Sequence, residues 1–196
     1  WRLTRTLATR EMERAGPEAV DVEVAELAAL LHDIADWKYS NSETEGVERA
    51  AAWLKSQGYD AARSARVLHI VENVSFHTEL GKKRKTDAEG APEEAPCLEL
   101  QVVQDADRLD AVGAIGIARC FTYGGHKKRK LYDLSNGGSI YRAESERADT
   151  LMSKEDYMGK GKKEDTVEHF YEKLLHLRGL MKTKAGAAIA DGRHQF

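Results

Sequence analysis

The stretch ELAALLHDIADWK, residues 26–38, carries the pattern from which the fold of this chain is predicted. At 100° per residue its apolar spacing predicts a helix over residues 20–35, with His32 and Asp33 near the end. The residues of its predicted core stripe are Val24, Leu27, Ala28, Leu31 and Ala35. Leu30 and Ala25 lie off that stripe, so we expect a helix that is apolar nearly all round and central to the fold. Ionisable groups in such a helix need a partner, because an apolar core does not keep them alone.

A second apolar stretch, VVQDADRLDAVGAIGIAR at residues 102–119, also contains carboxylates. The residues that share a predicted helical face with Asp107 are Leu100, Val103, Ala111 and Ala114. A lone buried carboxylate is costly and tends to stay protonated, whereas coordination to a divalent cation removes that cost. Two structural alternatives stay open. His32 can be a satisfied core histidine at a capped helix end, and Asp107 can form an internal salt bridge with an arginine.

Helical patterns cover most of the chain and predict an all-α bundle. The predicted helices span residues 1–15, 20–35, 43–57, 60–76, 97–123 and 163 to the C-terminus. Residues 81–96 (GKKRKTDAEGAPEEAP) are charged and contain Gly and Pro, which predicts a flexible surface loop. Residues 124–161 predict a longer loop, of a length that in a compact domain is usually functional or disordered, and we expect a functional one. We therefore expect one domain over residues 1–196.

Composition narrows the classes of function. The net charge is −3 and the basic residues form no continuous stripe, so we expect no nucleic-acid polymer as a partner. Cys97 and Cys120 lack a C-x-x-C spacing and give no disulfide framework, which is typical of a reducing compartment and predicts a cytoplasmic protein. No apolar run approaches the roughly 20 residues of a membrane span, so no membrane partner is expected.

Four stretches together resemble the HD superfamily of metal-dependent phosphohydrolases. They are HDIADWK, VQDADRLDAVGAIGIAR, GGHKKRKLYD and HFYEKLL, which begin at residues 32, 103, 124 and 169. The likeness runs from the first predicted helix to the C-terminus and is broken mainly by residues 81–96. It is greatest to a small branch that includes bacterial nucleoside-triphosphate pyrophosphohydrolases. The resemblance implies an HD-domain helical bundle.

The resemblance also implies a metal site. In the superfamily a histidine, an H-D pair and a distant aspartate bind the metal, and the last three positions match His32, Asp33 and Asp107. The first histidine is expected shortly before Arg2-Leu3, one or two positions before Trp1. Imidazole and carboxylate ligands without thiolate favour Mn²⁺, with Mg²⁺, Fe²⁺, Co²⁺ or Ni²⁺ as alternatives, over a closed structural zinc site.

Further site residues are expected beside these motifs. Asp36, one turn after Asp33, is a candidate to hold the attacking water or to act as acid or base, and Lys38 is a candidate phosphate ligand. The candidate substrate-binding residues are His77, Arg108, His126, Lys127, His169 and Lys173. His77 stands where relatives tend to have a lysine. Arg108 points about 100° away from Asp107 on a helix, so a structural role is its alternative.

Together with these residues, the resemblance implies a metal-dependent phosphohydrolase that acts on nucleotides and splits a nucleoside triphosphate into monophosphate and pyrophosphate. One alternative is a nucleotidase or phosphodiesterase that acts on another phosphate ester. The other is a non-catalytic HD module that binds a nucleotide as a sensor. A homodimer is a possible assembly of the chain in each case.

Overall fold

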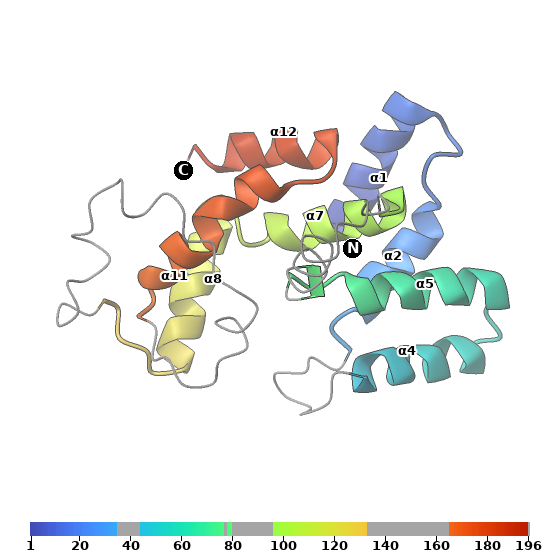
Figure 1. The fold of residues 1–196 in the computed structure, drawn as a ribbon, viewed down its shortest axis with the longest axis horizontal. Helices are drawn as coiled ribbons and strands as arrows, with labels where there is room; N and C mark the ends of the chain where they lie inside the picture. The colour runs from blue at the N-terminus through green and yellow to red at the C-terminus, as the bar shows by residue number, and fades with distance from the viewer. Residues whose placement is uncertain (35–43, 77, 80–95, 133–164, 196) are drawn as a thin grey trace, which may run out of the picture. The chain divides into compact units, whose positions relative to one another are not determined.

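The computed structural model describes residues 1–34, 44–76, 78–79, 96–132 and 165–195. Every element of regular structure in these described ranges is helical, so the prediction of an all-α fold is confirmed (Figure 1). The described chain divides into two compact units. The first comprises residues 1–106 and 182–186, and the second comprises residues 107–181 and 187–196. The predictions of one domain and of a surface loop at residues 81–96 are not tested by the described residues.

Among the described residues, the first unit contains four helices and the first part of a fifth. These are α1 (Arg2–Ala15), α2 (Val22–Leu31), α4 (Glu45–Ser56), α5 (Ala61–Asn73) and α7 (Leu98–Leu109), which enters this unit as far as Ala106. α2 packs against both α1 and α5, and α4 packs against α5. The core of this unit includes Leu7, Val24, Leu54, Val67, Ile70 and Val103. Because these side chains are buried together, the end of α2 that carries His32 is packed against the core.

Acidic side chains set where two of these helices begin. Asp21 is the N-cap of α2 and accepts from the amide of Val24, and Asp60 caps α5 in the same way through the amide of Arg63. The guanidinium of Arg63 also binds the Asp21 carboxylate, with Nη2 and Oδ1 2.6 Å apart. Because one carboxylate serves a cap on α2 and an ion pair from α5, it fixes the start of α2 against its neighbour.

The helix that carries His32 is less enclosed than its apolar sequence predicts. Val24, Ala28 and Leu31 are buried as expected, but Leu30 is 57% exposed. Ala25, which lies off the predicted stripe, is also fully buried. α2 packs against both α1 and α5, as expected of a central helix, but it presents one side to solvent near the H-D pair.

The second unit contains the end of α7 and the elements that follow it. These are α8 (Gly113–His126), α11 (Glu168–Glu172), the 3₁₀ helix η2 (Leu174–Leu180) and most of α12 (Lys184–Arg193). α11 packs against η2, and Leu109, Leu177 and Ala190 are buried. α8 also reaches three residues into the loop that the sequence predicts from residue 124.

A break divides the helix that the sequence predicts over residues 97–123. α7 ends at Leu109, and Asp110, Ala111 and Val112 donate to carbonyls three residues earlier, as in a tight turn. Gly113 then takes a φ of +76°, a left-handed conformation that favours glycine. The guanidinium of Arg193 donates to the carbonyl of Leu109 and so satisfies one helix-end acceptor. The prediction of one continuous helix is wrong because these tertiary contacts stabilise a break.

The predicted C-terminal helix is also divided. α11, η2 and α12 are separated at Lys173 and at Met181, where the backbone turns to an extended conformation with ψ of 139°. The segment from Lys182 to Gly186 then belongs to the first unit, where it binds two buried carboxylates. Because the backbone amides of this segment donate to these buried carboxylates, the chain does not continue as one helix there.

Candidate metal centre

His32 and Asp33 lie together where α2 ends. His32 is the C-cap residue of the helix, and its amide donates to the carbonyl of Ala28. Its Nε2 lies 3.3 Å from Oδ2 of Asp33. The imidazole is mostly enclosed, with 21% of the side chain exposed, whereas the Asp33 side chain is 72% exposed. The pair therefore has a packed base and a side that is open to solvent.

The other ring nitrogen of His32 indicates which nitrogen can bind a cation. Nδ1 lies 2.9 Å from the carbonyl oxygen of Ala29, a group that can only accept, so Nδ1 carries the proton. In a neutral imidazole the lone pair then lies on Nε2, on the side of the Asp33 carboxylate. Metal-ligating histidines have this arrangement, in which the second nitrogen donates to a carbonyl and fixes the ring.

The spacing of these two donors fits a shared cation. Ligands at about 2.1 Å from one ion, at right angles to one another, lie about 3 Å apart. The 3.3 Å between Nε2 and Oδ2 is close to that value. A protonated imidazole paired with the carboxylate would also fit this distance, and metal binding distinguishes the two.

The structure places Asp107 in a different environment from the one that the sequence predicts. It belongs to the second unit, near the end of α7, and its side chain is exposed. The expectation of a buried Asp107 amid an apolar face is wrong, because Ala111 and Ala114 lie beyond the end of α7 and do not continue its face. His32 and Asp33 belong to the first unit, so their convergence with Asp107 stays a prediction.

The fully buried carboxylate of α7 is Asp105, which sequence reasoning missed. Its side chain is fully buried and accepts from the amides of Lys182 and Thr183 and from the hydroxyl of Thr183. The signal was present in the sequence, since Asp105 lies three residues after Val102 and four before Leu109, on the buried stripe of the helix. The buried face of α7 is therefore the one that contains Asp105, not the predicted face that contains Asp107.

No group of three or more His, Cys, Asp or Glu side chains placed to hold a metal occurs within the part of the chain that the structure describes. His32 and Asp33 are a pair, so a complete ligand set requires further donors. Asp36, Lys38 and His77 lie outside the described residues, and their roles stay predictions.

Arg108 is held inside the protein. It is 5% exposed, and its guanidinium donates to the carbonyl of Leu180, the last residue of η2. This bond gives Arg108 a structural function in the second unit, in line with the alternative that the sequence left open. Its predicted contact with substrate stays a prediction.

A basic segment follows α8. His126 is exposed at the end of the helix, and the ammonium of Lys127 lies 5.6 Å from the centre of the Tyr123 ring. The guanidinium carbon of Arg129 lies 5.5 Å from the same ring. The amides of Lys127 and Arg129 donate back to carbonyls of α8, which closes the turn. The basic groups are thus held at the helix end, where its dipole favours cations.

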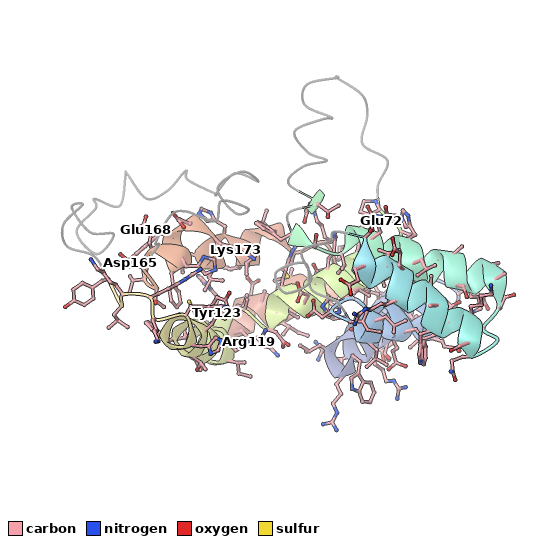
Figure 2. The ribbon with its side chains drawn as sticks, turned by 90° about the horizontal axis from the view of Figure 1, so that it is seen from below. Glu72, Arg119, Tyr123, Asp165, Glu168 and Lys173 are labelled. Carbon is pink, nitrogen blue, oxygen red and sulfur yellow. The ribbon has the colours of Figure 1, made fainter. Side chains whose placement is uncertain are left out.

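His169 and Lys173 are one turn apart, as the sequence predicts, since the amide of Lys173 donates to the carbonyl of His169. Their segment lies against α8. The rings of Phe170 and Phe121 are 5.7 Å apart between centroids, and the thiol of Cys120 donates to the carbonyl of Thr166. Figure 2 shows Lys173 on this segment and Tyr123 on the neighbouring α8. The second unit therefore holds four of the predicted basic residues, His126 and Lys127 at the end of α8 and His169 and Lys173 on the segment that lies against it.

Comparison with known proteins identifies the family. The family model described as HD domain matches residues 2–112. YpgQ of Bacillus subtilis is 32% identical over 179 residues, which are 91% of this chain and 69% of that protein. Its crystal structure in complex with ADP is similar at a TM-score of 0.63 and 29% identity, covering 100% of this chain and 80% of that one.

Two further crystal structures are similar over nearly the whole chain. A protein of Lactobacillus plantarum has a TM-score of 0.70 and 31% identity, covering 99% of this chain and 78% of that one. A protein of Bacillus thuringiensis, described as an HD-superfamily hydrolase, has a TM-score of 0.61 and 33% identity, covering 100% of this chain and 77% of that one. With the family model matching more than half of its residues, this chain belongs to the HD domain family.

Proposed function

We propose that this HD-family enzyme hydrolyses nucleotides and cleaves a nucleoside triphosphate to a monophosphate and pyrophosphate. The observation that carries the proposal is the His32–Asp33 pair. The Ala29 carbonyl holds the His32 ring through Nδ1, so Nε2 is directed toward the Asp33 carboxylate, 3.3 Å away. Two relationships support it further. The chain belongs to the HD domain family, and the similar protein YpgQ has been crystallised with ADP.

In this proposal His32, Asp33 and Asp107 hold one divalent cation, Mn²⁺ in preference to Mg²⁺, Fe²⁺, Co²⁺ or Ni²⁺. When bound, such a cation polarises a phosphoryl oxygen and makes water a better nucleophile near neutral pH. The Ala29 carbonyl keeps the imidazole oriented, so little reorganisation accompanies cation binding. The exposed carboxylates of Asp33 and Asp107 are accessible to a cation from solvent.

The remaining groups would bind the polyphosphate. His126, Lys127, His169 and Lys173 supply donors that offset the charge of the phosphates. Asp36 would orient water for attack on the α-phosphorus, and Lys38 would bind a phosphate oxygen. Water then attacks the α-phosphorus and supplies the new oxygen of the monophosphate. The bond from the α-phosphorus to the oxygen that it shares with the β-phosphorus breaks, and pyrophosphate leaves with that oxygen.

The test is a panel of nucleotides in heavy-oxygen water, with the protein extended by any residues that its gene encodes before Trp1. We expect Mn²⁺-dependent release of pyrophosphate, with the heavy oxygen in the monophosphate. Release of orthophosphate would support the nucleotidase alternative. Nucleotide binding without turnover, at every metal tried, would contradict the enzymatic proposal and support the sensor module.

A further inference from the structure

In the first unit, two buried carboxylates accept hydrogen bonds from backbone amides at and just before the start of α12. Asp105 on α7 accepts from the amides of Lys182 and Thr183, each at 2.8 Å, and from the Thr183 hydroxyl at 2.7 Å. Glu11 on α1 accepts from the amide of Ala185 at 2.9 Å. Both side chains are almost completely enclosed, with 0% and 1% exposure. The segment Lys182–Gly186 is therefore bound through its backbone to α7 and to α1.

The bonds made by Asp105 use the whole carboxylate. Oδ1 accepts from Lys182, and Oδ2 accepts from both donors of Thr183. The Thr183 hydroxyl in turn accepts from the amide of Gly186 at 2.9 Å. An asparagine at position 105 would place an amide N–H against one of these donors, so the arrangement requires a carboxylate.

Close packing adds a second constraint. A Cβ built on Gly186 would collide with Oδ2 of Asp105 and would come 2.9 Å from the Thr183 hydroxyl. Only glycine lets the backbone approach the carboxylate so closely at this position. The side chain of Lys182 also pairs with Glu79 at 2.5 Å. The hydrogen bonds of Asp105 and the close packing of Gly186 against it hold α7 in a defined rotation against the segment.

That rotation matters because Asp107 follows Asp105 by two residues on the same helix. Two residues turn a helix by about 200°, so the two carboxylates project to nearly opposite sides. One is fully buried and the other is exposed. A rotation of α7 that released Asp105 would carry Asp107 with it.

We propose that Asp105 is a positioning residue: by binding the Lys182–Thr183 backbone it fixes α7 so that Asp107 is presented to the cation. This inference rests on the proposed function, in which Asp107 is a metal ligand. Asp105 does not touch the cation and acts only through the helix.

The test uses the protein extended by any residues that its gene encodes before Trp1. Its Mn²⁺ affinity is measured by calorimetry, and amide hydrogen exchange is measured at Lys182 and Thr183. Asp105→Asn should accelerate exchange at these two amides and weaken Mn²⁺ binding about 10- to 100-fold, the usual cost of losing an outer support of a metal site. Gly186→Ala, which disturbs Asp105 without removing it, should weaken Mn²⁺ binding in the same direction. Thr183→Ser keeps the hydroxyl and should bind Mn²⁺ like the wild type.

Glu11→Gln is the matched control, since it alters the other buried carboxylate that binds the same helix start but lies on α1. It should change exchange at Ala185 and leave Mn²⁺ affinity within about twofold of wild type, because α7 keeps its own anchor. Circular dichroism confirms that each variant is folded. Wild-type affinity in Asp105→Asn, or an equal loss in Glu11→Gln, overturns the inference. Failure of the wild type to bind Mn²⁺ instead overturns the proposed function.

Discussion

Individual carboxylates in this chain have different functions according to their burial. Asp105 and Glu11 are enclosed and bind backbone amides, whereas Asp33 and Asp107 are exposed at the ends of α2 and α7. Burial without compensation is costly, so the enclosed pair needs its amide donors. The exposed pair lies where a cation can reach it from solvent.

Replacing Asp107 should remove activity without lowering the stability of the fold. Since its side chain is exposed, Asp107→Ala should reduce nucleotide hydrolysis to the background rate while leaving the unfolding midpoint close to wild type. Asp191→Ala is the control, because Asp191 is an exposed carboxylate in a surface ion pair with Arg178. It should keep full activity. Steady-state assays and urea unfolding check both, and an active Asp107→Ala protein would refute the role given to this residue.

Glu11 should make stability depend on pH. Burial alone raises the pKa of its carboxyl, but the bond from the Ala185 amide and the charges of Arg14 and Lys184 together lower that pKa below its usual range. A lowered folded-state pKa means stability that is present above the ordinary glutamate pKa of about 4.3 and is lost as pH falls through the folded value. Urea unfolding across that acidic range should show a shallower loss for Glu11→Gln. Identical pH profiles for the two proteins would contradict this.

At the scale of elements, the helices of the first unit follow from sequence more closely than those of the second. α1, α2, α4 and α5 begin and end within a few residues of their predicted positions, since apolar spacing, Asp21 and Asp60 mark them locally. The division between α7 and α8 has one local mark, Gly113, which was not enough to predict a break. It depends on Arg193, which lies about 80 residues later and donates to the Leu109 carbonyl. Sequence patterns alone do not contain that contact.

Gly113 gives a direct test of this break. Its φ of +76° and the carbonyl oxygen of Arg193, which a Cβ would approach to 2.6 Å, both oppose a side chain. Gly113→Ala should destabilise the protein by about 1–3 kcal/mol in urea unfolding. Gly125→Ala, in α8 with open space around the added atom, should be neutral or slightly stabilising. Equal stability of Gly113→Ala and wild type would show that the break does not need glycine.

At the scale of the whole molecule, the predicted site draws on residues far apart in the chain. The H-D pair and Asp107 were identified from sequence by resemblance to a family, and the family is confirmed. The sequence did not reveal that His32 is tethered to Ala29, or that Asp105 is the buried carboxylate of its motif. These depend on side-chain packing, which spacing does not specify. In the described residues no helix has the length and apolar character to cross a membrane.

The basic groups of the second unit should affect substrate binding more than turnover. Lys173→Ala and His126→Ala should each raise KM about tenfold with little change in kcat, if they bind phosphates remote from the cleaved bond. Lys55→Ala, at the exposed end of α4 in the first unit, is the control for loss of a positive charge and should leave KM unchanged. A loss confined to kcat would place Lys173 or His126 in the chemical step instead.

The central claim is that His32, Asp33 and Asp107 bind one divalent cation. A crystal structure grown with Mn²⁺, with the ion located by its anomalous scattering, tests this most directly. We predict one Mn²⁺ ion with Nε2 of His32 and a carboxylate oxygen from each aspartate at about 2.0–2.6 Å. An ion bound elsewhere, or an Asp107 carboxylate more than about 8 Å from the His32–Asp33 pair, would contradict the account, because no side-chain adjustment of the usual reach closes that gap.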